Sequence, residues 1–520
     1  MAQKTARSQN SVKNAAISLI YYFISNVFGF VMKMVLIRCI GIEYAGLNSL
    51  LVNIVGVLNI AELGIGTAVG YALYKPLAEE DSEKVNEIIC LYKYLYRIIA
   101  LVIAVIGIII TIFIENFVNT NIPIAEVRIS FVLYLLLTIA SYLLTFLNVL
   151  PSADQKNYMV VRIQNNGKII KDILELTGLI LFKNFYVWLT IEILSYIIIY
   201  IYTSLKIRRS YQWYVPSNRY KIKELLNKYK DIVKRTKDLV FHKIGGLCVY
   251  QTDIILISYF CNLTDSGIYS NYMLIYNLLT GVVEQVFMGI TASIGNLIID
   301  KTEKDVYRIW KEMYVMMMFA TILFGFLFYQ LANPFITVCF GDYTLASIVV
   351  LGISLNIMFR VIKNPIDKFK EAYGIFWDIY APIVESLINL VFSIILAFKF
   401  GILGIVLGTV ISNVVITMIW KPYVVFKYAF KEKFSKFLLI NTKYLIIGII
   451  GLAISYGLIG SIHLNIENAI LNLIALFAIN GIITVGIVMI CFLFDKFFRD
   501  TFKKYCNIIL NMIKRKATAN

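Results

Sequence analysis

The feature that most constrains this chain is a succession of long apolar runs, separated by short segments rich in charged or turn residues. A helix needs about 20 apolar residues to cross a hydrocarbon core roughly 30 Å thick, because each residue rises about 1.5 Å. Fourteen runs are candidates; they lie near residues 15–40, 45–74, 88–114, 122–150, 160–182, 185–205, 236–260, 267–299, 307–330, 335–360, 374–398, 401–427, 438–460 and 468–494.

These runs predict an all-α, polytopic membrane protein. Of the 520 residues, 59% are hydrophobic and 16% are charged, which excludes a soluble domain. The runs are too continuous for the alternating strands of a membrane barrel, and an open sheet would leave unpaired backbone groups in lipid. We predict about 14 transmembrane helices in two pseudo-symmetric six-helix lobes plus two C-terminal helices. The expected segments are a cytoplasmic N-terminus (1–14), an N-lobe (15–205), a basic linker (206–235), a C-lobe (236–427), helices 13 and 14 (438–494) and a basic tail (495–520).

The distribution of lysine and arginine predicts the orientation. With the N-terminus inside and fourteen spans, 43 of the 49 basic residues fall on the cytoplasmic side, where such residues accumulate. We therefore expect both termini to be cytoplasmic and the protein to lie in a bacterial inner membrane. The net charge of +17 then reflects attraction to anionic lipid rather than to nucleic acid. No small-residue cleavage site closes the first run, so we expect it to be retained as a span.

Cysteine and histidine give little material for catalysis or metal binding. The seven cysteines are odd in number and far apart, and the two histidines, His242 and His463, are distant in sequence. Their spacing predicts neither a disulfide framework nor a zinc site. We expect no cofactor and no enzymatic activity.

A weak internal repeat divides the first twelve spans into six and six. At an offset of 221 residues, 43–89 aligns with 264–310, and the identical positions include Gly46/Gly267 and Ser49/Ser270. Because six is even, both halves would enter the membrane from the same side. Parallel repeats of this kind are typical of transporters that rock two lobes around a central cavity.

Charged residues within the spans are the candidate site residues, because each costs about 2.5 to 3.5 kcal/mol to insert and so normally faces a cavity or a partner. The cavity candidates are Lys33, Arg38, Glu62, Asp253 and Glu284. Lys33 is the strongest of them, being deep in the first run. The alternative for Lys33 is a purely structural ion pair with Glu62 or Asp253, and Arg38 is close enough to a helix end to extend to the interface.

A deep lysine suits an anionic headgroup such as a pyrophosphate. Carboxylates nearby could bind a proton or a sodium ion and couple transport to the membrane potential. The sequence leaves open whether such coupling occurs.

Several segments of the first two spans and of the second lobe resemble the Wzx-type oligosaccharide flippases of the polysaccharide transporter family, within the multidrug/oligosaccharidyl-lipid/polysaccharide exporter superfamily. They are Gly29-Phe30, Ile37–Gly41, Glu43–Leu50, Ala61–Gly66, Leu73–Ala78, Gln251–Ile255 and Gly267–Tyr272.

The resemblance implies two six-helix lobes, alternating access and an undecaprenyl-pyrophosphate-linked oligosaccharide as substrate, for capsule, O-antigen or another surface polysaccharide. It also implies contact with membrane lipids and, as further partners, a polysaccharide polymerase and glycosyltransferases. Lys33 and Arg38 match basic residues in the first helix of the related lipid II flippases. This chain has Met32-Lys33 where that group often has an arginine followed by an acid, which favours the Wzx-like branch.

Two other functions remain open. A multidrug exporter of the same superfamily would share the lobes, but typically has twelve helices and needs no basic cavity. A membrane-embedded polysaccharide polymerase generally places catalytic residues in a sizeable external loop, and the expected external loops here are short. The sequence identifies neither the glycan nor the oligomeric state.

Overall fold

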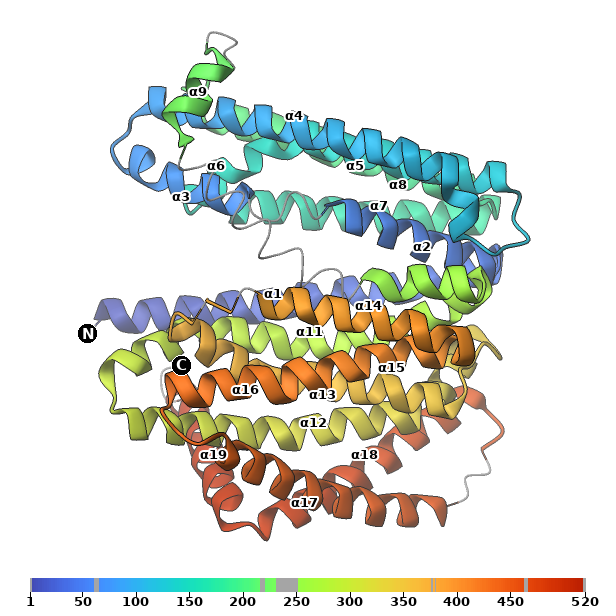
Figure 1. Ribbon diagram of the computed structural model, residues 1–520, viewed down its shortest axis with the longest axis vertical. Coiled ribbons are helices and arrows are strands. Elements are labelled where there is room, and N and C mark those ends of the chain that lie inside the picture. Colours follow the sequence, from blue (N-terminus) through green and yellow to red (C-terminus); the bar gives the residue numbers. More distant parts are fainter. Residues whose placement is uncertain are drawn as a thin grey trace. The chain divides into compact units, whose positions relative to one another are not determined.

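The computed structural model describes residues 2–59, 65–215, 220–230, 251–375, 377–378, 380–462 and 466–517. Within these ranges every regular element is a helix, which confirms the predicted all-α class (Figure 1). The α-helices are α1 (Ala2–Cys39), α2 (Ile42–Leu58), α3 (Ile65–Ala78), α4 (Ser82–Phe113), α5 (Ile124–Thr145), α6 (Val149–Ala153), α7 (Tyr158–Phe182), α8 (Phe185–Ser210), α9 (Ile222–Lys228), α11 (Leu263–Asp300), α12 (Glu303–Phe340), α13 (Ser347–Ala372), α14 (Tyr380–Phe400), α15 (Ile402–Asn413), α16 (Lys421–Val424), α17 (Phe434–Gly460), α18 (Ala469–Leu493) and α19 (Lys496–Ala517).

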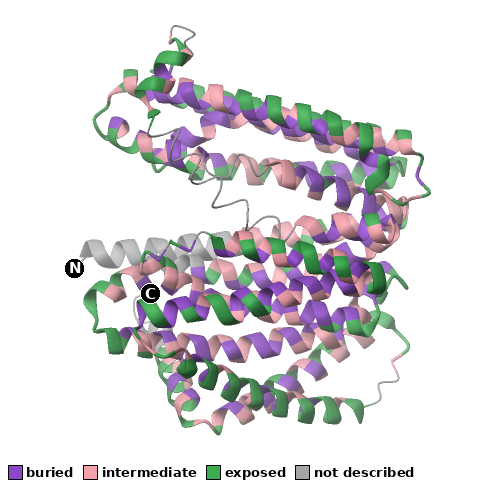
Figure 2. Cartoon of the chain, in the orientation of Figure 1, coloured by how far each residue is buried: buried purple, intermediate pink, exposed green. Residues whose placement is uncertain are grey.

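Many of these helices carry apolar side chains on their outer faces, as a lipid-facing protein requires. In the described part of the chain, 10 helical segments are long and apolar enough to cross a membrane. Figure 2 shows exposed positions along the outer faces of many helices. Large aliphatic residues are among the exposed ones, for example Leu101 on α4 at 65% and Ile482 on α18 at 74%. Exposed apolar surface on this scale is unfavourable in water. The fourteen spans expected from the sequence remain a prediction.

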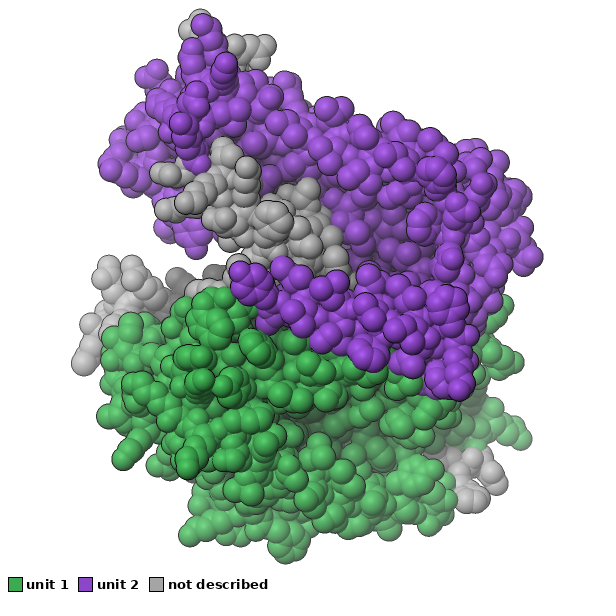
Figure 3. Space-filling model, in the orientation of Figure 1, with its two compact units in different colours: residues 1–20, 271–378, 406–520 green, residues 21–270, 379–405 purple. Residues whose placement is uncertain are grey.

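The chain forms two compact units (Figure 3). One unit comprises 21–270 and 379–405, and the other comprises 1–20, 271–378 and 406–520. Within the first unit, α4, α5, α7 and α8 pack against one another, and within the second, α12 contacts α13, α17 and α18. The predicted lobe boundaries follow the chain order instead, and they remain predictions.

Helix starts repeat at the offset seen in the sequence. α2 and α11 begin 221 positions apart, and so do α4 and α12. The residues preceding the second pair, Asp81 and Thr302, each cap their helix by accepting a hydrogen bond from a backbone N–H three residues later, that of Lys84 or Asp305. Such a cap satisfies one of the free N–H groups in the first turn of a helix.

The crossing of α2 and α11 has the same internal symmetry. A Cβ atom on Gly46 would lie 1.9 Å from the carbonyl oxygen of Leu263, and one on Gly267 would lie 2.5 Å from the carbonyl oxygen of Ile42. Both contacts are with backbone, so the close approach requires glycine on each helix. The two glycines and their two contact residues are related by the 221-residue offset.

One helix boundary expected from the sequence is wrong. The apolar runs 307–330 and 335–360 were separated near Pro334, but α12 continues through this proline to Phe340. The turn comes at Gly341, whose φ of 88° is in the left-handed region that glycine tolerates. As a result α13 extends to Ala372, and the basic stretch 360–370, expected in a cytoplasmic loop, is helical.

The basic tail 495–520 is helical over Lys496–Ala517, as its pattern of apolar and basic residues predicts. The Asp495 carboxylate accepts a 2.9 Å hydrogen bond from the backbone N–H of Phe498, in the first turn of α19. The Phe498 ring is fully buried and packs on Phe492 of α18, with the ring centroids 5.0 Å apart. This end of α19 is therefore fixed to the helices of its own unit.

Candidate functional site

Lys33 extends from α1 to the first turns of α11. Its ammonium group donates a hydrogen bond to the hydroxyl of Ser270. That hydroxyl donates its own hydrogen to the carbonyl oxygen of Gly267, 2.7 Å away, so its lone pairs are available to the lysine. Ser270 is buried and Lys33 is partly buried. Among the residues that the structure describes, no carboxylate forms an ion pair with Lys33.

Asp253 lies in the helical segment 251–260 and is also buried. Its carboxylate accepts a 3.1 Å hydrogen bond from the hydroxyl of Tyr269. Since Tyr269 and Ser270 are consecutive on α11, the candidate cation Lys33 and the candidate anion Asp253 contact neighbouring residues of one helix. The structural ion pair between Lys33 and Asp253, left open by the sequence, is not formed.

The structure supports a site role less for two other sequence candidates, Arg38 and Glu62. Arg38 is exposed in the last turn of α1, where its charge complements the negative end of the helix dipole. Arg38 lies five positions after Lys33, so the two side chains leave the helix on different faces. Glu62 lies outside the described residues, and its predicted role and its pairing with Lys33 remain predictions.

Glu284 on α11 has a partner that sequence reasoning missed. The guanidinium of Arg360 on α13 donates to its carboxylate at 2.9 Å and lies 5.5 Å from the centre of the Tyr276 ring. Arg360 is the last residue of the apolar run 335–360, and the basic stretch that begins with it is expected in a loop. A row of polar residues at helical spacing, Asn356, Arg360 and Asn364, was the signal that the helix continues.

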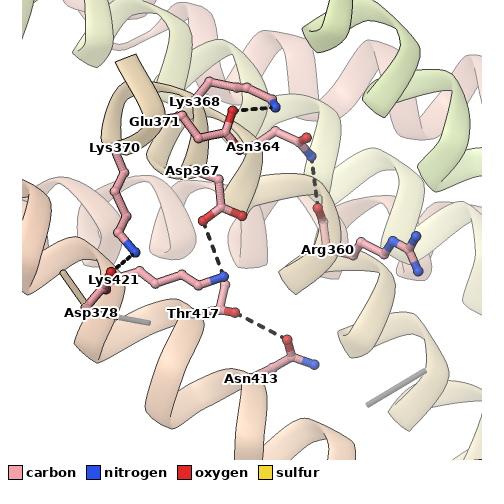
Figure 4. Close-up of polar contacts among 10 residues, drawn as sticks. All are labelled: Arg360, Asn364, Asp367, Lys368, Lys370, Glu371, Asp378, Asn413, Thr417 and Lys421. Atoms are coloured by element: carbon pink, nitrogen blue, oxygen red, sulfur yellow. Dashed lines mark hydrogen bonds and ion pairs between the residues drawn. The ribbon is translucent and has the colours of Figure 1, made fainter. Parts of the chain in front are cut away.

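The C-terminal half of α13 carries further ion pairs, shown in Figure 4. Asp367 pairs with Lys421 of α16 at 3.3 Å, and Lys370 pairs with Asp378 just beyond the helix. Lys368 pairs with Glu371 one turn along α13, at 2.8 Å. In this cluster each of these cations has a carboxylate partner. Matched pairs of this kind fix the packing of α13 against its neighbours and offer no free charge to a ligand.

α7 carries a cluster of different composition. The Lys171 ammonium lies 2.9 Å from a carboxylate oxygen of Asp172 and 2.7 Å from one of Glu175, and all three side chains are buried. It also lies 5.2 Å from the centre of the Tyr196 ring on α8. Glu192, also on α8, is close enough to act electrostatically on Lys171 and Asp172. One lysine therefore faces three carboxyl groups.

The hydrogen bonds of Glu192 limit where protons can be. The hydroxyl of Tyr134 on α5 is 2.9 Å from a carboxyl oxygen of Glu192 and is also within hydrogen-bond distance of the Asn48 side chain on α2. A tyrosine hydroxyl has one hydrogen and cannot donate to both. The second bond needs a hydrogen from the Asn48 amide or from a protonated Glu192 carboxyl. A protonated Glu192 is thus one of two arrangements that satisfy these contacts.

The charged groups of these arrangements differ in what they can bind. In the described ranges, no group of three or more His, Cys, Asp or Glu side chains is arranged to hold a metal ion. Lys33 offers a positive charge and hydrogen-bond donors, which anions such as phosphate accept. The α7–α8 cluster offers carboxyl groups in excess of its lysine.

Comparison with known proteins gives a family match and a set of structural relatives. The model of the family described as "Polysaccharide biosynthesis protein" matches residues 11–294. A search of curated proteins finds no match.

The structure resembles a lipid II flippase MurJ in an inward closed conformation, with a TM-score of 0.68 and 16% identity over 92% of this chain and 98% of that one. It also resembles an inward-facing multidrug resistance MATE family transporter, with a TM-score of 0.55 and 13% identity over 79% and 99% of the two chains. A MATE transporter of Vibrio cholerae, VcmN, gives a TM-score of 0.52 and 11% identity over 83% and 99%. At these identities the likeness shows the fold.

The descriptions of these structures name a lipid II flippase and multidrug transporters. The family match covers more than half of the chain and agrees with the resemblance found in the sequence. The chain therefore belongs to the polysaccharide biosynthesis protein family, with the fold of the lipid II flippase and of the MATE transporters.

Proposed function

We propose that this protein is a flippase that carries an undecaprenyl-pyrophosphate-linked oligosaccharide across the cytoplasmic membrane during synthesis of a surface polysaccharide such as capsule or O-antigen. The family supplies the pathway class and the fold supplies a lipid-flippase architecture. The observation that carries the proposal is Lys33, a partly buried lysine held by a serine hydroxyl instead of a carboxylate.

Such a lysine is poised for an anionic ligand. An ammonium group has three hydrogens, and one of them is used on Ser270. Burying a cation costs free energy unless a partner compensates its charge. Because Lys33 is already partly buried, a pyrophosphate that accepts hydrogen bonds from its remaining donors would compensate that cost with little further desolvation of the lysine. Asp253 is held by Tyr269 on the same stretch of α11. Its carboxylate would repel an anion placed close to it and so direct the headgroup toward the lysine.

Alternating access fits the internal repeat. Helices that begin at equivalent positions, and a glycine crossing related by the same 221-residue offset, support two like-oriented halves. In transporters built from parallel repeats, substrate is released on the far side when one half rocks against the other. The headgroup would cross within the protein while the lipid tail stays in the bilayer.

We further propose that a proton gradient drives the cycle through Glu192. The donor count at Tyr134 and the excess of carboxyl groups around Lys171 support a proton that can be taken up and released. Moving one charge across the membrane potential supplies about 2.3 kcal/mol per 100 mV. Sodium coupling would require several oxygen ligands around one ion.

The test of the flippase function is complementation of a strain lacking this gene. Lys33→Gln removes the charge, Lys33→Arg keeps it, and Arg38→Gln serves as a matched control at the exposed end of the same helix. We expect surface polysaccharide to be lost with Lys33→Gln and to remain with the other two, at equal protein levels. Full complementation by Lys33→Gln would remove the lysine from headgroup binding.

The second candidate function is multidrug export, which the fold of the MATE relatives favours. The same deletion strain distinguishes the two. A flippase mutant loses surface polysaccharide and accumulates lipid-linked saccharide, whereas an exporter mutant gains sensitivity to cationic drugs with its polysaccharide intact.

The flippase proposal has three further parts. They are the placement in a bacterial inner membrane, the cytoplasmic termini and the association with a polymerase and glycosyltransferases.

A further inference from the structure

A cavity of about 540 Å³ lies between α7 and α8, apart from Lys33 and its partners. Its walls come from one stripe of each helix. Arg162 and Lys206 are at the end where α7 begins and α8 ends, and the walls beyond them are mainly aliphatic, with Ile170 and Leu174 on α7 and Ile198 on α8. The cavity is therefore amphipathic along its length.

The two cations at its end have no protein partner among the residues that the structure describes. Within the described part of the chain, the side chains of Arg162 and Lys206 form no hydrogen bond or ion pair, and both are exposed. The aliphatic walls are exposed as well, Ile170 at 60% and Ile198 at 64%. α8 is long and apolar enough to cross a membrane, and the sequence predicts a further span over 160–182, which α7 covers. Basic groups without a partner among the described residues, beside uncovered apolar walls, complement an anionic headgroup that continues into a hydrocarbon chain.

We propose that this cavity binds an anionic phospholipid of the surrounding bilayer, with its phosphate on Arg162 and Lys206 and one acyl chain along the aliphatic stripe. The distance along α7 from Arg162 to Leu174 is about 18 Å at 1.5 Å per residue, close to the half-thickness of a hydrocarbon core of roughly 30 Å. The site thus matches one leaflet.

The size of the cavity favours a phospholipid over the transported substrate. A volume of about 540 Å³ is in the range of sites for small molecules. It accommodates a phosphodiester and part of an acyl chain, whereas several sugars on a polyprenyl pyrophosphate need considerably more room. The cavity shares no residue with the Lys33 region, but Lys171 of the α7–α8 cluster lines it as well. The variants used below therefore leave Lys171 and its carboxyl partners unchanged.

The test measures lipid binding to the purified full-length protein by native mass spectrometry. Phosphatidylglycerol and phosphatidylcholine are titrated separately. We expect the wild-type protein to retain one phosphatidylglycerol more tightly than the others, and to prefer it over phosphatidylcholine. The double variant R162Q/K206Q should bind that lipid roughly thirtyfold more weakly, because it loses two basic groups near an anionic head.

A matched control separates the cavity from general charge attraction. Arg208 and Arg209 lie on the same end of α8 but do not line the cavity. The variant R208Q/R209Q has the same net charge as R162Q/K206Q and should keep the tight lipid. An equal loss of phosphatidylglycerol binding in the two double variants would overturn the proposal, since any basic surface would then bind the lipid as well.

A second pair of variants tests the acyl-chain part without changing charge. Ile170→Trp fills the stripe, and Ile180→Trp, at an equally exposed position of α7 outside the cavity, is its control. We expect only Ile170→Trp to weaken binding. Unchanged phosphatidylglycerol binding in Ile170→Trp would contradict the proposal. So would a cavity variant that binds phosphatidylglycerol normally but no longer binds a polyprenyl-linked saccharide.

Discussion

α7 and α13 both carry several charged residues, but their charges are balanced in different ways. On α13, Arg360, Lys368 and Lys370 are each matched with a carboxylate, that of Glu284, Glu371 and Asp378 respectively. On α7, Lys171 faces more carboxyl groups than it can neutralise, and Arg162 has no protein partner in the described ranges. Matched pairs account for packing, whereas unmatched charges mark places where a proton or a ligand completes the balance.

The largest expected effect is at the unbalanced cluster. Lys171→Met leaves buried carboxyl groups without their cation and should destabilise the protein by about 3–5 kcal/mol. Protonation neutralises carboxylates, so the loss in melting temperature should shrink as the pH falls. Lys168→Met, one turn earlier on α7, is the control. A melting temperature for Lys171→Met equal to that of the control at every pH would contradict the comparison.

The next effect is at a matched pair of α13. Lys370→Met leaves the buried Asp378 carboxylate without its cation and should lower the free energy of unfolding by about 3 kcal/mol. Adding Asp378→Asn should restore part of that loss, because the charge that lacked a partner is gone. Thermal unfolding of the single and double variants in detergent measures the coupling. Additive effects would show that the two side chains do not depend on each other.

A smaller change in stability is expected for Glu192→Gln. The amide keeps a hydrogen bond to Tyr134, so the free energy of unfolding should change by less than about 1 kcal/mol. Transport, in contrast, should lose its dependence on a proton gradient. Uptake assays in vesicles at fixed and varied pH gradients measure this, and an unaltered gradient dependence would exclude Glu192 as the coupling group.

The smallest effect on stability is expected for R162Q/K206Q. Both side chains are exposed and lack protein partners among the described residues, so their removal should change stability by no more than about 0.5 kcal/mol. The melting temperature in detergent without added lipid checks this. A large loss would mean that these cations belong with the matched pairs of α13 after all.

The sequence predicts much of this fold because lipid imposes simple rules. Long apolar runs gave the helical class, and the 221-residue repeat anticipated that α2 and α11 begin at equivalent positions. The predicted boundary near Pro334 is wrong, because a proline inside a membrane helix need not end it. The tenth run ends at Arg360, whereas α13 continues to Ala372, so the sequence predicts a loop where the helix continues.

The candidate site was less predictable, because it depends on pairing. The sequence located Lys33 and Glu284 as buried charges, but not that Ser270 would hold the first or that Arg360 would neutralise the second. Asp172, in the fifth apolar run, is buried against Lys171. Depth in an apolar run is visible in a sequence, whereas the identity of a partner on another helix is not.

The most direct measurement of the central claim is transbilayer movement of a labelled polyprenyl-pyrophosphate-linked saccharide in vesicles containing the purified protein. We predict movement well above that of protein-free vesicles for the wild type and for Lys33→Arg, and movement at the protein-free level for Lys33→Gln. Equal rates with and without the protein, or an unchanged rate in Lys33→Gln, would contradict the account.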